Sequence, residues 1–280
     1  MLAAVGCFSL MDAAMKLLVR HYPPFQVACL RGAAALPFVI VWLQLTGGWR
    51  GLTRVRWKLQ AVRGVIGVGM LTSFIFSVKW LSLADAYAIF FAAPLLITAL
   101  SVPFLGERVE WQRWLAIVVG LVGVLAMLRP TGQGWLSLAG LGALGAALAY
   151  AVSAVIVRVL SRTDTTGSMN IWYTISIAVG AGAIAAPGWV PLRREDWPWI
   201  AVVGMLGAAG QHFITEAFSL APATVVAPFE YTALLWGVGL DLALWGVLPD
   251  PAILGGASVV IASGLYLLHR ERTHLEAEHP

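Results

Sequence analysis

Ser82-Leu83-Ala84-Asp85-Ala86 separates two long apolar runs of this chain, and Ser219-Leu220-Ala221-Pro222-Ala223 separates two others. The second segment begins 137 positions after the first and nearly repeats it. A near repeat at this distance, in a chain this apolar, predicts that the protein arose by doubling a membrane unit. Internal repeats of that kind are typical of transporters.

The composition supports a membrane protein. Of the 280 residues, 60% are hydrophobic and only 11% are charged, whereas soluble domains average about 25% charged residues. The net charge of +4 is small, and Lys and Arg cluster at the ends of apolar runs, where lipid headgroups anchor them. We therefore expect a lipid bilayer and a small molecule as partners, and no nucleic acid.

Motifs for enzyme chemistry are missing from the sequence. It contains no His-Glu-x-x-His motif, no Gly-x-Ser-x-Gly elbow and no phosphate-binding glycine loop. Cys7 and Cys29 lie inside apolar runs and form neither a disulfide framework nor a metal-ligand spacing. We expect no enzyme activity, no cofactor and no metal.

The apolar runs predict an all-α integral membrane protein of ten transmembrane helices. A span needs about 20 mostly apolar residues, and ten runs qualify, at about 2–19, 23–45, 60–80, 85–104, 111–128, 136–157, 168–187, 197–217, 222–246 and 252–268. The chain is read as a single membrane domain, 1–280, that divides into a first repeat, a second repeat and a short cytoplasmic tail, at 1–130, 131–268 and 269–280. Because five helices per repeat is an odd number, the repeats are inverted around a central cavity, which suits alternating access.

Basic residues predict the orientation. If the N-terminus lies inside, the inner side receives most of the Lys and Arg, including Arg56, Lys58, Arg63 and Arg108, as the positive-inside rule requires. Both termini are therefore expected in the cytoplasm.

Charged residues inside the predicted spans are the first candidates for a site, because such charges are costly in lipid. Asp12 and Lys16 share one helix face, either as an ion pair or with Asp12 in proton coupling or gating. Arg31 is expected to snorkel or to pair with Asp12.

Lys79 and Glu216 each precede a repeated segment by three residues, so they are symmetry equivalents of opposite charge. They could attract the two charged ends of a zwitterion at successive stages, close a gate, or lie as simple interfacial charges. His212, four residues before Glu216, could form a proton relay or a helix-stabilising pair with it.

Pro94 and Pro228 predict breaks in the fourth and ninth spans, because proline removes a backbone donor. Broken helices line cavities in transporters. Glu230, two residues after Pro228, is therefore predicted to face a cavity as a substrate or proton site. The spacing of Glu230 and Asp241 places them on one helix face.

Aromatic residues follow a helical spacing on the fourth span, at Tyr87, Phe90 and Phe91, and recur on the ninth at Tyr231 and Trp236. They either pack against helices and lipid or form an aromatic pocket that binds a ring-bearing substrate.

Two motifs give a family resemblance: Gly106-Glu107-Arg108 and Ala227-Pro228-Phe229-Glu230-Tyr231-Thr232-Ala233-Leu234-Leu235-Trp236. With the ten-helix pattern, they resemble the EamA-type exporters of the drug/metabolite transporter superfamily, and most closely their bacterial aromatic amino acid exporters. The resemblance implies a cavity lined by the third, fourth, eighth and ninth helices, in a bacterial cytoplasmic (inner) membrane. This chain departs from the family pattern at Gly246-Val247, where family members usually have a second Gly-Glu pair.

These observations predict a secondary exporter of amino acids, chiefly aromatic ones, working by alternating access as a monomer, with a dimer left open. A broad exporter of hydrophobic or cationic metabolites and drugs is the alternative. A membrane scaffold is a third reading, although the short loops leave little room for a partner.

Overall fold

In the computed structural model, all regular structure in the described residues is helical. The description covers residues 1–46, 48–53, 55–105, 137–221 and 226–248, with scattered positions in 111–122 and 251–266. The α-helices are α1 (Leu2–Leu18), α2 (Pro24–Thr46), α3 (Trp57–Trp80), α4 (Leu83–Phe90), α5 (Ala92–Leu105), α7 (Leu138–Leu160), α8 (Thr166–Ala185), α9 (Trp197–Leu220) and α11 (Ala233–Trp245). Short 3₁₀ segments are η1 (Gly48–Gly51), η2 (Ala186–Gly188), η3 (Arg194–Asp196) and η4 (Ala227–Thr232).

The helices match the predicted membrane spans wherever they are described. Within the described residues, five segments are long and apolar enough to cross a bilayer: Pro24–Thr46, Trp57–Trp80, Leu83–Leu105, Leu138–Leu160 and Thr166–Gly188. Large apolar side chains on these and neighbouring helices face outward, such as Leu45, Val65 and Leu235, each at least 75% exposed. Such exposure suits a lipid environment. The spans predicted at 111–128 and 252–268, the motif at 106–108 and the tail at 269–280 lie largely or wholly outside the described residues.

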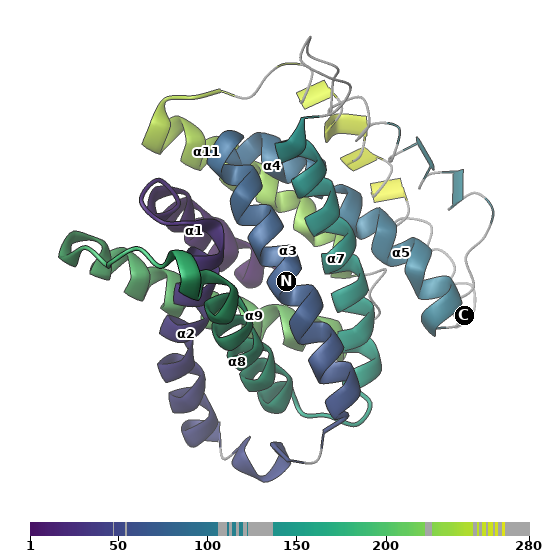
Figure 1. Ribbon diagram of the computed structural model, residues 1–280. Helices are drawn as coiled ribbons and strands as arrows, with labels where there is room; N and C mark the ends of the chain where they lie inside the picture. The colour runs from purple at the N-terminus through teal and green to yellow at the C-terminus, as the bar shows by residue number, and fades with distance from the viewer. Residues whose placement is uncertain are drawn as a thin grey trace.

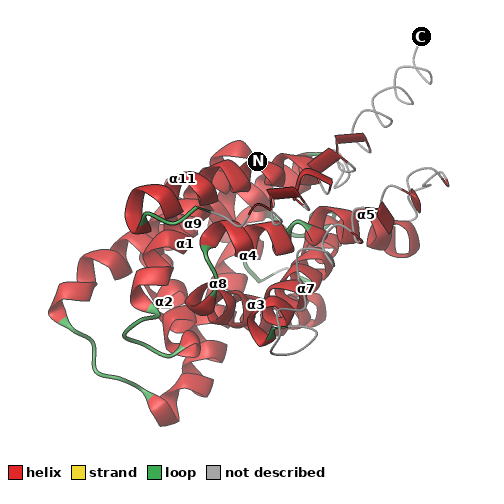
Figure 2. Ribbon diagram, turned by 90° about the horizontal axis from the view of Figure 1, so that it is seen from above, coloured by secondary structure: helices red, strands yellow, loops and turns green. Residues whose placement is uncertain are grey.

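Helices of the two halves pack against each other in a reciprocal way (Figure 1). The second helix of each half packs on the other, α2 on α8. The first helix of each half packs on the third helix of the other, α1 on α9 and α7 on α3. The α3–α7 pair lies side by side in both views (Figure 1, Figure 2). This exchange is the pattern expected for two repeats that enclose a site between them.

A helix ends in extended backbone beside each repeated segment, although α3 ends before its segment and α9 continues two residues into its own. After α3, Leu81 is extended at φ −103°, ψ 159°, and after α9, Ala221 is extended at φ −137°, ψ 158°. In the first segment Ser82 then caps α4, because its hydroxyl accepts a 3.0 Å hydrogen bond from the Asp85 N–H. The residues 222–225 of the second segment lie outside the description.

The fourth and ninth spans are both interrupted. The fourth divides at Phe91 into α4 and α5, one turn before Pro94, whose nitrogen cannot donate to the Phe90 carbonyl. The ninth begins as the 3₁₀ segment η4, which contains Pro228, and becomes α-helical only at Ala233. Both breaks bring irregular backbone to the centre of the molecule.

Small residues allow the closest helix contacts. A Cβ at Gly204 of α9 would clash with the backbone carbonyl of Ala34 on α2. On α7, Ala143, Ala147 and Ala151 are fully buried, in the clusters that pack around α5 and α9. These small residues serve packing within the chain.

Candidate functional site

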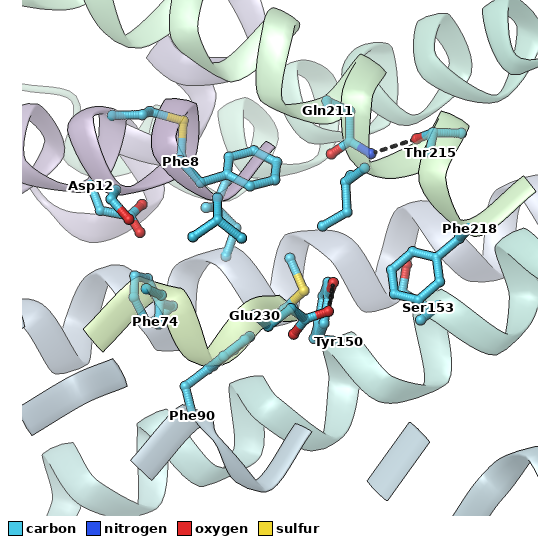
Figure 3. A pocket seen from close by; sticks show the side chains of 18 of the residues that line it. Phe8, Asp12, Phe74, Phe90, Tyr150, Ser153, Gln211, Thr215, Phe218 and Glu230 are labelled. Carbon is cyan, nitrogen blue, oxygen red and sulfur yellow. Dashed lines mark hydrogen bonds between the residues drawn. The ribbon is translucent and has the colours of Figure 1, made fainter. Parts of the chain in front are cut away.

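A cavity of about 150 Å³ lies between the two halves, with a largely aromatic wall. Its rings come from Phe8, Phe74, Phe90, Phe91, Phe218, Tyr87, Tyr150 and Tyr173, and its polar groups include Asp12, Arg31, Arg63, Gln211, Thr215 and Glu230. Figure 3 labels several of these residues, among them Asp12, Glu230, Phe74, Phe90 and Phe218. Helices α1, α3, α7 and α9, the break between α4 and α5, and η4 all contribute. The cavity therefore lies where both halves meet and where the helices are broken.

Asp12 occupies one side of the cavity on α1. Its side chain is buried, and Oδ2 accepts a 2.8 Å hydrogen bond from the Tyr87 hydroxyl on α4. Arg31 of α2 interacts with Asp12 electrostatically, while its Nε lies 3.2 Å from the Met11 sulfur. Among the described residues Arg31 forms no ion pair within 4 Å, so the expected Asp12–Arg31 pairing is a longer-range interaction.

Glu230 forms the second carboxylate site, in η4. The carboxylate is buried, and Oε1 accepts a 2.7 Å hydrogen bond from the Tyr150 hydroxyl on α7. Figure 3 shows the two side chains together, on the side of the cavity nearer Phe218 and farther from Asp12. The sequence did not single out Tyr150, because it lies on α7 without a neighbouring charge or an aromatic stripe.

The two carboxylate–phenol pairs are exchanged between the halves. In the first half the acid is on the first helix and the phenol on the fourth, at Asp12 and Tyr87. In the second half the phenol is on the corresponding first helix and the acid on the interrupted fourth, at Tyr150 and Glu230. Each half thus places one buried carboxylate at the shared cavity, but from a different helix.

Aromatic side chains connect the two pairs along the cavity. Phe74 stacks with Tyr87 at a ring-centroid distance of 6.1 Å and meets Phe90 edge-on at 5.5 Å. Phe90 lies 5.3 Å from Tyr150, and Tyr150 lies 6.4 Å from Phe218. The chain of rings offers a flat substrate group continuous contact between the two carboxylates.

Arg63 differs most from its expected place. The sequence reading assigned it to the inner loop charges, but it lies in the second turn of α3, is only 2% exposed and lines the cavity. The predicted span 60–80 already contained Arg63, and its burial comes from the packing of α3 against α8, where the guanidinium lies over the Tyr173 ring. Its Nη1 donates a 3.0 Å hydrogen bond to the Met169 carbonyl.

Five of the residues predicted to serve in binding or gating do not line the cavity: Lys79, His212, Glu216, Tyr231 and Trp236. Lys79 is exposed at the end of α3, above the Trp80 ring. His212 packs 4.4 Å from the Trp42 ring and interacts electrostatically with half-buried Glu216.

Of the remaining two residues, Tyr231 lies beside the cavity and Trp236 lies on the outer surface. Buried Tyr231 contacts Phe91 edge-on at 5.1 Å, and Trp236 is 42% exposed beside Gly6. Pro94 is buried next to the break. The structure thus brings together Asp12, Tyr87, Phe90, Phe91 and Glu230 of the predicted site.

The Lys16 ammonium pairs with Asp241 of α11 at 3.4 Å, and not with Asp12 as one reading of their spacing suggested. It also donates to the Leu81 carbonyl at 3.0 Å, while Asp241 accepts a 2.7 Å bond from the Ala84 N–H. In the second half Arg158 occupies the matching place, in the last turn of α7, as Lys16 does in α1. It donates to the carbonyls of Phe218 and Ser219, at 3.5 and 3.1 Å. Within the described residues, Arg158 has no acidic partner.

Asp241 does not share a face with Glu230 as predicted. The eleven-residue spacing assumed one continuous α-helix, whereas Ala227–Thr232 is 3₁₀ and turns each residue through a larger angle. Glu230 therefore lines the cavity, while Asp241 is buried against the start of α4.

Comparison with known proteins agrees with the two-half architecture. The model of the EamA-like transporter family matches residues 1–129 and again 137–269. The chain is 26% identical to an S-adenosylmethionine uptake transporter of Rickettsia prowazekii, over 97% of this chain and 92% of that one. It is 27% identical to the pseudopaline exporter CntI of Pseudomonas aeruginosa, over 91% and 90%. A protein of known crystal structure shares the fold, with a TM-score of 0.67 at 17% identity over 94% of each chain.

Proposed function

This chain belongs to the EamA-like transporter family, and we propose that it exports ring-bearing small molecules of the amino acid type across the bacterial inner membrane. The matched family and the named relatives are transporters, which confirms that the chain is a multi-pass membrane transporter and not an enzyme. Substrate class, direction and mechanism are the proposal: aromatic amino acids are its leading members, and alternating access between the two halves is its mechanism.

The observation that carries the proposal is the central cavity. In it, two carboxylates that accept hydrogen bonds from tyrosines, Asp12 and Glu230, flank a row of aromatic rings. A substrate ammonium group is attracted to a buried carboxylate far more strongly than in water, because the surroundings have a low dielectric constant. Phe74, Phe90 and Phe218 offer apolar area for a ring and negative ring faces for a cation.

The relatives support a broader class than aromatic amino acids alone. S-adenosylmethionine carries an α-amino acid group, a positive sulfonium and an adenine ring, so it combines a charged head with a flat group. The proteins named for it are 26% identical to this chain. One relative is named for uptake and another for export, so the export direction rests on the predicted resemblance to amino acid exporters.

Export of hydrophobic cations is the second candidate. It is favoured by Asp12 and Glu230, which have no ion-pair partner within 4 Å among the described residues and could each neutralise a cation. This candidate requires no interaction with a substrate carboxylate, which separates it from amino acid transport.

Flux through purified protein in liposomes tests both candidates. Labelled phenylalanine, labelled S-adenosylmethionine and tetraphenylphosphonium would be compared with and without a pH gradient. Saturable flux of either amino acid compound supports the proposal, and dependence on the pH gradient would identify proton coupling. Flux of tetraphenylphosphonium alone would favour the second candidate.

Variants identify the residues involved. Asp12→Asn and Glu230→Gln should each lower phenylalanine flux at least about tenfold, because a charge-assisted hydrogen bond contributes about 1.5–3 kcal/mol. Lys79→Ala tests the predicted carboxylate contact at the end of α3. Unchanged flux in both Asp12→Asn and Glu230→Gln would remove the cavity from the transport path, and unchanged flux in Lys79→Ala would refute the carboxylate contact predicted for Lys79.

A further inference from the structure

Arg63 is a buried cation without a counter-ion in the described part of the chain. It is 2% exposed, and no carboxylate of the described residues lies within 4 Å of it. Its Nε has no hydrogen-bond partner there, although the atom is buried. The side chain nevertheless lines the central cavity. Arg63 is near the end of α3 that follows η1. At the opposite end of α3, Lys16 donates to the Leu81 carbonyl and pairs with Asp241.

The neighbours of Arg63 hold it in place but do not neutralise it. Nη1 donates to the Met169 carbonyl at 3.0 Å, and the guanidinium lies 4.6 Å over the ring of Tyr173. Gly67, one turn further along α3, leaves room for that ring, since a Cβ there would clash with it. A carbonyl and a ring face stabilise a cation only in part, and a buried unpaired charge carries a large desolvation penalty.

The positive charge of the other cavity arginine, Arg31, is partly compensated by a nearby acid. Arg31 interacts electrostatically with Asp12, which lines the same cavity. A substrate carboxylate placed beside Arg31 would therefore also meet the negative charge of Asp12. Neither arginine has an acid within 4 Å among the described residues, but Arg31 interacts with the charge of Asp12, whereas the buried Nε of Arg63 has no hydrogen-bond partner there. Arg63 is therefore the less compensated of the two cavity cations.

We propose that Arg63 binds the carboxylate of the transported molecule, with Tyr173 as the platform that orients the guanidinium. This inference rests on the proposed function and assigns the negative end of the substrate. A planar guanidinium can present two parallel N–H donors to a carboxylate. Tyr173 interacts electrostatically with Tyr150, the phenol that donates to Glu230. The ammonium end would therefore lie toward Glu230 while the carboxylate lies at Arg63.

The test compares ligands that differ only in their charged groups. Phenylalanine carries both groups, 2-phenylethylamine lacks the carboxylate, and 3-phenylpropionate lacks the ammonium. Dissociation constants would be measured by calorimetry on purified wild type, Arg63→Gln and Lys58→Gln. Lys58 is the matched control, because it is an exposed cation at the same end of α3.

Arg63→Gln should raise the dissociation constant for phenylalanine by about 10- to 100-fold and leave that for 2-phenylethylamine within about twofold. Binding of 3-phenylpropionate should be lost in Arg63→Gln, and Lys58→Gln should resemble wild type throughout. An equal loss for phenylalanine and 2-phenylethylamine, or no loss for either, would overturn the assignment.

Arg63→Lys provides a second variant should the glutamine variant fail to fold. It keeps the charge but not the two parallel donors, so it should weaken phenylalanine binding about tenfold while sparing 2-phenylethylamine. Binding of 3-phenylpropionate distinguishes the proposed anion site at Arg63 from the proposed amino acid transport. Wild-type binding of 3-phenylpropionate that depends on Arg63, without phenylalanine flux, would sustain the anion site and refute amino acid transport. No binding of 3-phenylpropionate by wild type would refute the anion site itself.

Discussion

Asp12 and Glu230 are buried within spans predicted to cross the membrane, and each accepts a hydrogen bond from one tyrosine. A charged side chain at the bilayer centre costs about 2.5–3.5 kcal/mol on insertion scales. One phenolic hydrogen bond offsets only part of that cost. Both residues line the cavity, which supports a role in transport over one in packing.

Tyr150→Phe is predicted to impair transport without unfolding the protein. The change removes the 2.7 Å hydrogen bond to Glu230 but keeps the ring that contacts Phe90 and Phe218. Loss of a hydrogen bond to a charged group should lower phenylalanine flux in liposomes about tenfold.

Tyr231→Phe is the matched control. Tyr231 directly follows Glu230 and is buried, but its hydroxyl has no hydrogen-bond partner among the described residues and lies outside the cavity wall. Its flux should stay within about twofold of wild type. Similar losses in both variants would show that Tyr150 acts through general packing.

The sequence pointed to both partners of the Asp12–Tyr87 pair but only to the acid of the Tyr150–Glu230 pair. Asp12 and Glu230 stand out as charges within apolar spans, and Tyr87 belongs to a visible aromatic stripe. Tyr150 gave no such signal, because its bond to Glu230 joins residues 80 positions apart. Arg63 was misplaced because a basic residue near a span end usually reaches the headgroups, and its burial depends on the packing of α3 against α8, which the sequence does not show.

At the scale of elements, prolines locate the breaks but not their geometry. Pro94 predicts an interruption, which the structure places at Phe91, in the turn where the missing N–H acts. The 3₁₀ form of η4 has no comparable sequence signal, since Pro228 fixes only its own φ. This explains why Glu230 was predicted to face a cavity while its relation to Asp241 was not predicted correctly.

Gly204→Ala is predicted to destabilise the contact between α9 and α2. The added Cβ would clash with the Ala34 carbonyl, and backbone cannot move aside as a flexible side chain can. Overpacking of this kind typically costs about 1–3 kcal/mol. The melting temperature of the purified protein in detergent should fall.

Gly145→Ala on α7 is the control for that change. A Cβ there meets nothing within 4 Å, and the position is exposed. Because alanine favours helix over glycine by about 0.8–1.0 kcal/mol, its melting temperature should stay level or rise. A fall equal to that of Gly204→Ala would show that helix glycines are generally required.

At the scale of the whole molecule, hydropathy predicted most helices, but not their pairing. Apolar runs and the odd number of spans per half indicate ten helices in inverted repeats. The apolar runs do not reveal that α1 packs on α9 and α3 on α7. Contacts between transmembrane helices depend on the local fit of their side chains and not on overall apolarity. The cavity polar groups therefore come together from helices that no sequence interval relates.

Neither half should be stable alone, because the first and third helices of each half pack on the opposite half. Fragments 1–130 and 131–280, expressed separately in cells, are predicted to be degraded, and their co-expression should restore both. Protein levels in membranes and co-purification through a tag on one fragment would measure this. Stable accumulation of either fragment alone would contradict it.

Lys16 and Arg158 make different contacts at the two ends of the molecule. At one end Lys16 holds both the Leu81 carbonyl and the Asp241 carboxylate, whereas at the other Arg158 holds only the carbonyls of Phe218 and Ser219 among the described residues. In the proposed alternating-access cycle, breaking the Lys16 contacts would separate opposite charges, whereas breaking the Arg158 contacts would separate a cation from neutral carbonyls. Equal and opposite substrate gradients would therefore drive unequal fluxes, so the transporter would act as a rectifier whose preferred direction is set by one ion pair.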